Sequence, residues 1–435
     1  MFKRLVVVVM VLLLTVSLSY GSESEAILKL LLKKGVITQK EYEELVIELK
    51  TVGTPEEAKD KAGAEPEAAS HQDKHMLHEK DGIPNFFKGL SVAGNVVTVG
   101  QTTSGNKKNN PPGGDVTNAN LRAQFEVGRP LGENGQVFFK TEAGVGKGLV
   151  QDGRLDTFLG VNETAANKYD SYLWVREAWY EHKLLEGKLT FTFGKLDFAN
   201  YFDTNAVANN ENNQFLSSGF VNSKAIELPS FTGGVRMTIS PVELIYVSLG
   251  WQRGDSQWEN IFNKPFLIAE VGVKPKIGEL QGNYRINAWT NRTDHIEIKD
   301  PTNKTAKGWG TGLSADQQVT DSLTLFGRLG YQDGKVYKYD VAWSAGLALS
   351  GKLWGRNDDV LGLAYGMAIL SKDYRDYMSA SKKSHGDENR AELYYSILLK
   401  KYLVISPDVQ YISNALGDRG FHNVWVFGLR TKIFF

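Results

Sequence analysis

Large apolar side chains alternate with small or polar ones along most of the chain, from about residue 88 to the C-terminus. The clearest runs are 189–193, 341–350 and 361–369. Because successive side chains of a β-strand point to opposite faces, this period of two predicts strands with one apolar and one polar face. In a soluble β-sandwich the apolar face would point inward. In an outer-membrane barrel it faces lipid, and the polar face lines water.

The lengths of the connections between the expected strands favour the barrel. We expect strands near 89–99, 119–128, 135–146, 171–183, 187–196, 231–240, 242–252, 265–275, 279–290, 308–319, 321–332, 338–350, 358–370, 389–400, 401–412 and 421–435. Long connections alternate with short ones up to about residue 307, and the later connections are less regular. Outer-membrane barrels have short periplasmic turns and long extracellular loops, and a sandwich has no reason to sort its loops this way. The fold class predicted for 88–435 is therefore all-β, a transmembrane antiparallel β-barrel of about 16 strands.

The first 87 residues carry a different pattern. Residues 1–21 are typical of a secretory signal peptide, with Lys3 and Arg4 before an apolar stretch and Gly21 at the expected cleavage position. Apolar residues in 22–53 recur at helical spacing, which predicts a short periplasmic α-helical hairpin. So small a hairpin buries little apolar surface alone. It is therefore either stabilised by a binding partner or part of a loosely ordered periplasmic extension. Residues 54–87 are a polar linker.

The overall composition argues against several classes of protein. Lys plus Arg and Asp plus Glu both number 50, so no net positive charge indicates a nucleic-acid partner. The chain has no Cys, which excludes thiolate chemistry and a lipid anchor on an N-terminal Cys. His71, His75 and His78 could gather on one helical face, but three solvated histidines in a polar linker are the simpler interpretation. We therefore expect no metal site and no other cofactor.

Enzymatic activity is also not expected. A barrel hydrolase would need a Ser with an aligned His on a strand, and the four histidines outside the linker lie near strand ends or in loops. The segment before the barrel is too short for the plug of an energy-coupled transporter.

The last strand has apolar residues on one face and ends in phenylalanine. The residues of that face are Trp425, Phe427, Leu429, Thr431, Ile433 and Phe435. A terminal Phe after such alternation resembles the signal read by the outer-membrane insertion machinery. We therefore expect that machinery as a partner through Phe435, and the outer membrane as the location of the protein.

Two stretches carry a sharper resemblance. In 173–223 a strand pair ends in GKLD at 194–197 and is followed by a loop rich in Tyr, Asp and Asn. The segments 357–366, 391–418 and 426–435 include a PDVQYI strand at 407–412. These features resemble the carbohydrate-selective porin family, the OprB type, over most of 170–435. The resemblance implies facilitated diffusion of monosaccharides, whereas periodicity alone indicates only a barrel.

The polar faces of the strands supply candidates for the pore wall. A Lys or Arg facing lipid at mid-bilayer costs about 2–4 kcal/mol, which favours an inward assignment. The pore-lining candidates are Arg122, Glu126, Lys140, Glu142, Arg236, Glu270, Arg285, Trp289, Arg328, Tyr394, Asp408, Gln410 and Arg430. They could bind sugar hydroxyls while Trp289, Tyr246 or Tyr394 stacks on the sugar ring, or they could form structural pairs that neutralise one another.

The third long connection, 197–230, is a candidate for a constriction. Third loops of 16-stranded porins commonly fold into the lumen. The constriction-loop candidates are Asp203, Asn205, Asn209, Asn210, Glu211, Asn213 and Gln214. Amides both donate and accept hydrogen bonds, which suits uncharged polyols. A surface loop that is simply rich in Asn is the alternative. The register of 171–183 stays open, because Arg176 and Glu177 compete for the lumen.

The sequence therefore predicts an outer-membrane channel for small hydrophilic solutes, most specifically monosaccharides. An anion- or phosphate-selective pore and a general diffusion pore are the alternatives, because the lumen candidates include a basic excess that carboxylates dilute. The expected partners are the lipid bilayer and lipopolysaccharide, small sugars and, by default for porins, two further copies in a homotrimer.

Overall fold

The computed structural model describes residues 32, 39, 42, 89–106, 114–149, 155–165, 170–302 and 304–435. The chain divides into two compact units, Met1–Glu67 together with Phe435, and Ala68–Phe434. All described strands lie in the second unit. Residues 32, 39 and 42 are helical. The rest of the expected signal peptide, hairpin and linker, including His71, His75 and His78, lies outside the described residues.

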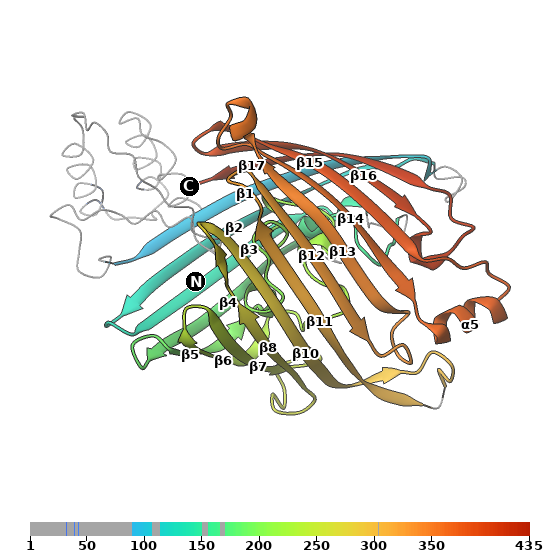
Figure 1. Cartoon of the computed structure of the whole chain (residues 1–435), viewed down its shortest axis with the longest axis horizontal. Coiled ribbons are helices and arrows are strands. Elements are labelled where there is room, and N and C mark those ends of the chain that lie inside the picture. The colour runs from blue at the N-terminus through green and yellow to red at the C-terminus, as the bar shows by residue number, and fades with distance from the viewer. Residues whose placement is uncertain are drawn as a thin grey trace. The chain divides into compact units, whose positions relative to one another are not determined.

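The second unit is built from antiparallel strands (Figure 1). Their bounds are β1 Ser91–Ser104, β2 Thr117–Leu131, β3 Gly135–Val145, β4 Ser171–Leu184, β5 Leu189–Leu196, β6 Thr232–Val242, β7 Ile245–Arg253, β8 Pro265–Val273, β9 Lys276–Ile277, β10 Leu280–Ile296, β11 Thr305–Gln318, β12 Leu323–Gln332, β13 Tyr339–Ser350, β14 Val360–Leu370, β15 Glu388–Lys400, β16 Leu403–Ser413 and β17 Val424–Phe434.

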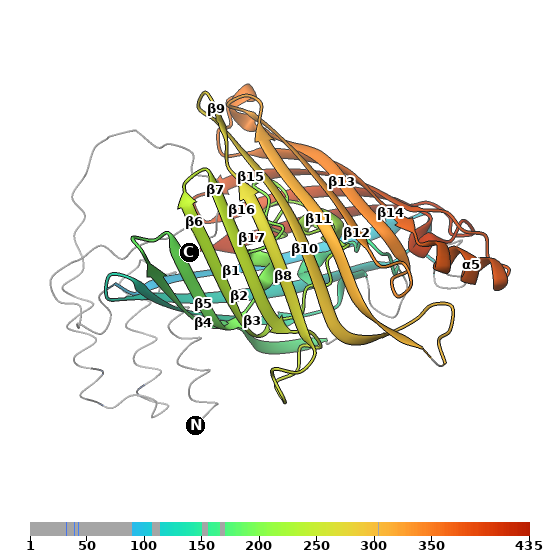
Figure 2. The same cartoon turned by 60° about the horizontal axis from the view of Figure 1, so that its bottom comes forward.

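Pairing of the first strand with the last closes the sheet into a barrel. β1 and β17 run antiparallel from the pair Asn95 and Phe434 to the pair Ser104 and Trp425. Each strand otherwise pairs with its sequence neighbours, except that β8 pairs directly with β10 and the two-residue β9 pairs only with β10. The wall is thus a closed barrel of 16 strands with one extra short strand, which confirms the predicted fold class (Figure 2).

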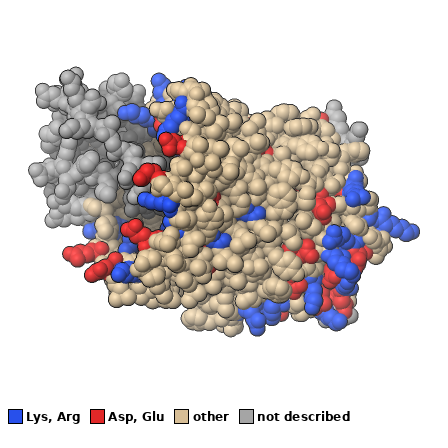
Figure 3. Space-filling view, viewed as in Figure 1, with Lys and Arg blue, Asp and Glu red and all other residues tan. Residues whose placement is uncertain are grey.

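The apolar face of the strands points out of the barrel. Leu313, Leu329, Leu363, Leu393 and Leu429 are all exposed on the outer face. Figure 3 shows a largely uncharged band across one side of the barrel, with Lys, Arg, Asp and Glu gathered at its two ends. This distribution matches an outer-membrane barrel, in which the band lies against lipid and charged loops and turns lie in water.

The described helices are short and lie in the connections. They are α4 Ser218–Val221, α5 Lys372–Ala380 and the 3₁₀ turns η3 Glu163–Ala165, η4 Phe198–Asn200, η5 Gly351–Trp354 and η6 Ala415–Gly417. Among the described residues, no helix is both long and apolar enough to cross a membrane.

Candidate functional site

The inner face of the barrel carries the charged residues expected at the pore wall. On β2 and β3 the register places Gln124 opposite Glu142 and Glu126 opposite Lys140. The amide of Gln124 donates to the Glu142 carboxylate at 2.8 Å. Many of the other candidates are deeply buried, namely Arg122, Glu142, Glu270, Arg285, Arg328, Asp408, Gln410 and Arg430. These side chains are buried because connections between the strands fold into the barrel and cover them.

The connection between β5 and β6, residues 197–231, lies inside the barrel (Figures 1 and 2). Arginines of the wall donate to its backbone carbonyls. The guanidinium of Arg328 reaches the carbonyl oxygens of Asp203 and Phe220, both at 2.9 Å. Arg430 reaches the carbonyl oxygens of Glu211 at 2.8 Å and Gln214 at 2.6 Å. We name this segment the inner loop.

Carboxylates of the wall satisfy backbone N–H groups of the inner loop. Glu392 accepts hydrogen bonds from Leu216 N at 2.5 Å and Ser217 N at 3.0 Å. Glu270 accepts one from Asp203 N at 2.8 Å. A backbone N–H removed from water needs such a partner, because leaving it unpaired costs free energy comparable to a lost hydrogen bond. Glu270, a pore-wall candidate from the sequence, and Glu392 therefore hold the inner loop in place.

Two charged residues of the inner loop make ion pairs with the wall. The Asp203 carboxylate lies 3.0 Å from the Arg328 guanidinium and accepts a hydrogen bond from Ser223 N at 2.6 Å. The Glu211 carboxylate lies 2.6 Å from Arg122. Burial raises the pKa of the Glu211 carboxyl, but Arg122, a backbone hydrogen bond and Lys140 together outweigh burial and hold that pKa below its usual value.

Small residues of the wall make room for aromatic residues of the inner loop. A Cβ atom on Gly250 would lie 2.7 Å from Phe198 and 2.8 Å from Phe202, so both rings pack directly on this glycine of β7. On β14, a Cβ on Gly366 would lie 2.9 Å from Phe220. Glycines on the inner faces of β7 and β14 therefore provide the space in which aromatic rings of the inner loop pack.

A band of side chains near the short turns is left partly exposed on the inner face. The Lys140 ammonium pairs with Glu126 at 2.8 Å, and the two side chains are 17% and 26% exposed. Arg236 pairs with Glu181 at 2.9 Å, with both side chains 14% exposed. The Arg236 guanidinium also lies 4.2 Å from the centre of the Tyr201 ring. We call these five residues the polar band.

A β-bulge decides the orientation of Arg176 and Glu177. Lys140 pairs with Glu177 and Thr141 with Val175, so Arg176 is the extra residue on β4. A bulge lets two consecutive side chains turn towards the same side. Arg176 lies 3.4 Å from the Glu142 carboxylate, and Glu177 accepts a hydrogen bond from the Asn200 amide at 2.9 Å. Both residues therefore contact the lumen side, and the competition expected from the sequence does not arise.

Comparison with known proteins agrees with this architecture. Residues 115–435 match the family described as carbohydrate-selective porin, OprB family. The chain belongs to this OprB family. The solved high-pH structure of Pseudomonas putida OprB superposes on it with a TM-score of 0.71 at 18% identity, covering 80% of this chain and 95% of that one. This similarity establishes the OprB-like barrel fold.

Two curated proteins are similar in sequence to parts of this OprB-family chain. An uncharacterized protein of Aquifex aeolicus is 26% identical over 239 residues, which cover 55% of this chain and 62% of that protein. Porin B of Pseudomonas aeruginosa is 22% identical over 299 residues, which cover 60% of this chain and 58% of Porin B. The chain thus spans less than two thirds of the length of either relative.

The inner loop of this OprB-family barrel uses most of its predicted amides for its own structure. The Gln214 side chain accepts hydrogen bonds from Asn209 N at 2.6 Å and Asn210 N at 2.9 Å. The Asn205 amide donates to the backbone of β11 at Ala315, at 3.1 Å. The Asn213 side chain accepts a hydrogen bond from Lys432 at 2.8 Å. Loop and wall atoms therefore already occupy much of the hydrogen-bonding capacity of these amides, and their contact with solute hydroxyls stays a prediction.

The aromatic residues expected to stack on sugars also have another role in the OprB-family barrel. Trp289 is 4% exposed, stacks on Phe266 with ring centres 5.9 Å apart and donates to the Ala225 carbonyl. Tyr394 is 1% exposed and meets Phe215 edge to face at 4.9 Å. Both rings lie beneath the inner loop, so their faces contact protein. Tyr201, on the inner loop itself, is the aromatic residue that joins the polar band.

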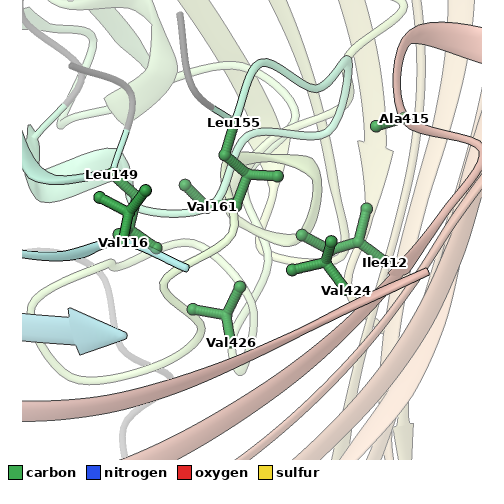
Figure 4. Close-up of a cluster of buried hydrophobic side chains, with 8 residues drawn as sticks. All are labelled: Val116, Leu149, Leu155, Val161, Ile412, Ala415, Val424 and Val426. Carbon is green, nitrogen blue, oxygen red and sulfur yellow. The ribbon is translucent and has the colours of Figure 1, made fainter. Parts of the chain in front are cut away.

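A second inserted loop was missed by the sequence analysis. In the β3–β4 connection, the amides of Phe158 and Leu159 donate to Glu388 at 2.8 and 2.9 Å. Figure 4 shows its Leu149, Leu155 and Val161 packed with residues of β16, β17 and neighbouring loops. The signal was present in the sequence, because a fully solvated loop has no need of four large aliphatic residues at 149, 155, 159 and 161.

Proposed function

We propose that this chain forms an outer-membrane channel through which small neutral carbohydrates diffuse, and that it has no catalytic role. One observation carries the proposal beyond the family match. The polar band is a partly exposed strip of paired charges and one aromatic ring on the inner wall. Sugar hydroxyls both donate and accept hydrogen bonds, so neighbouring ammonium, guanidinium and carboxylate groups suit them. Tyr201 supplies an apolar face for the C–H side of the ring.

The pairing of charges within the band supports a neutral solute over an anion. Lys140 lies against Glu126 and Arg236 against Glu181, so each cation has a carboxylate within 3 Å. Paired charges give a local field that orients polar solutes without a strong preference for one sign. An anion-selective pore is better served by rings of unpaired Lys and Arg.

The proposal includes the rest of the expected biology. Residues 1–21 direct export, Phe435 is recognised by the insertion machinery, the apolar outer face contacts lipid, and lipopolysaccharide surrounds the extracellular loops. The working form is a homotrimer. The alternating apolar face of the last strand and the family match support these steps.

Liposome swelling tests the proposed function. Refolded protein is inserted into liposomes, and influx of glucose is compared with influx of a neutral non-sugar solute of similar size. Faster influx of glucose supports a carbohydrate channel. Equal rates for the two solutes would reduce the protein to a general diffusion pore, and the absence of swelling with either solute would contradict the open channel itself.

A further inference from the structure

A second polar and aromatic pocket lies at the loop end of the barrel, separate from the polar band. It has a volume of about 370 Å³, and its lining includes Phe158, Lys224, Glu227, Gln332, Tyr337 and Tyr339. These residues come from both inserted loops and from the segment that spans the end of β12, the following connection and the start of β13. A solute that enters from the loop end therefore meets this pocket, and with it the inner loop, before it reaches the polar band.

The carboxylate of Glu227 is a fixed acceptor in this pocket. It accepts hydrogen bonds from the Tyr337 hydroxyl at 2.5 Å and the Asn291 amide at 3.0 Å, and it lies 2.9 Å from His295 Nε2. Its side chain nevertheless stays 37% exposed. Burial and the nearby Glu227 raise the pKa of Tyr337, so this hydroxyl keeps its proton and donates to the carboxylate.

The aromatic walls of the pocket are also held in place. The Phe158 and Tyr339 rings lie 5.0 Å apart. The Tyr339 hydroxyl donates to the Lys224 carbonyl at 2.9 Å, and the Gln332 amide donates to the Tyr339 carbonyl at 2.9 Å. These bonds fix the side chains without a solute, so little ordering entropy is lost when a solute binds.

The combination of groups selects the chemistry of the occupant. Apolar ring faces next to a carboxylate acceptor and the Lys224 side chain fit a molecule with both C–H and hydroxyl faces. Lys224 and Lys338 line the pocket together with Glu227, so the lining carries charges of both signs and offers an uncharged polyol both donors and acceptors. A wholly apolar solute would strip water from Glu227 and Lys224 without replacing their hydrogen bonds.

We propose that this pocket binds a neutral hexose at the outer mouth of the channel, before the sugar passes the inner loop. The proposal rests on the proposed carbohydrate function and adds to it a saturable site at the loop end of the barrel. It also assigns residues to that site. Tyr337 and Phe158 pack on the ring, Glu227 accepts from hydroxyl groups, and Lys224 donates to them.

The test is the block of ion current by glucose in planar bilayers that contain the full-length protein. Glucose is added on the loop side, and the glucose concentration that gives half of the maximal block is measured. Tyr337→Ala and Glu227→Ala should each raise that concentration about fivefold, the effect of losing one ring contact or one hydrogen bond. The current without sugar is recorded for each variant, and block is expressed as a fraction of that current.

Two further variants separate binding from loss of structure. Tyr377→Ala removes an exposed tyrosine of α5, also on the loop side, and should leave glucose block unchanged. Tyr337→Phe keeps the ring and should weaken block less than Tyr337→Ala does. If block is the same in Tyr337→Ala, Glu227→Ala and the unchanged chain while glucose still passes, this inference is wrong and the proposed function stands. If the unchanged chain passes no glucose, the proposed function fails first.

Discussion

Replacement of Arg328 by Leu should release the inner loop from the barrel wall. The Arg328 side chain is 1% exposed, and it faces the fully buried Asp203 carboxylate at 3.0 Å. It also donates to the carbonyls of Asp203 and Phe220 and, at 3.3 Å, to the Asn209 side chain. Leu fills similar space but supplies none of these hydrogen bonds.

The free-energy cost of Arg328→Leu comes from the buried Asp203 carboxylate, which loses its ion-pair partner. Removing one partner of a buried ion pair typically costs about 3–5 kcal/mol. Burial raises the pKa of the Asp203 carboxyl, and the Arg328 guanidinium opposes that rise. In the variant Asp203 can therefore take up a proton, which places the cost near the lower end, about 3 kcal/mol. That free energy shifts the ratio of docked to released loop by about 150-fold.

Trypsin provides a direct assay for release of the inner loop. Lys224 is the only Lys or Arg in 197–231, so cleavage within this segment reports on a single bond. Arg328→Leu should be cleaved after Lys224 at least tenfold faster than the unchanged chain, and its single-channel conductance should rise. Arg292→Leu, which alters an exposed arginine of β10, is the matched control. Equal cleavage and equal conductance in all three proteins would refute the reasoning that Arg328 anchors the loop.

Three other predictions concern the polar band, a turn and the outer face. Glu126→Gln should shift the reversal potential in a salt gradient towards anion preference, because it leaves Lys140 unpaired. Lys140→Gln leaves Glu126 unpaired and should shift the reversal potential towards cation preference. No shift in either variant would show that the pair lies outside the ion path. Burial raises the pKa of Asp359, but hydrogen bonds from Arg356, Tyr395 and Leu398 N outweigh it and lower that pKa. A lowered pKa stabilises the fold above the unfolded value of about 3.9 and stops doing so as pH falls through the folded value. Asp359→Asn should therefore reduce the free energy of unfolding into urea by about 1–3 kcal/mol at pH 7, and less at acidic pH; a difference independent of pH would contradict this. Leu329→Arg on the outer face should cost about 2–4 kcal/mol in the same assay with lipid vesicles, whereas Leu353→Arg in a turn should cost little.

The strands were predictable because the closed barrel imposes one rule on every strand. Apolar residues at every second position must face lipid, and a slip of one residue would reverse both faces of a strand. The predicted strand 338–350 corresponds to Tyr339–Ser350, and 358–370 to Val360–Leu370. The expected break at 291–307 was too wide, because β10 continues past a bulge near Asn291 to Ile296. Local irregularities of this kind depend on loop packing, which a period of two does not encode.

The inward direction of the pore-wall residues was also predictable, but their partners were not. Alternation identifies which side of a strand Glu392 occupies. It does not show that Glu392 accepts from the backbone of Leu216, which is 176 residues away in sequence. The same limit explains why Trp289 and Tyr394 looked available for sugar stacking. Only the path of the inner loop decides whether a lumen side chain meets water or protein.

The central claim is that solutes pass along the polar band. A direct measurement is possible because the chain has no Cys, so an introduced Cys is its only thiol. We would follow glucose influx into liposomes that contain the Lys140→Cys variant, before and after reaction with a bulky thiol reagent. Tyr394→Cys, beneath the inner loop, is the matched control. The account predicts that the reagent slows influx through Lys140→Cys and leaves Tyr394→Cys unaffected. Unslowed influx through fully labelled Lys140→Cys would contradict a path along the polar band.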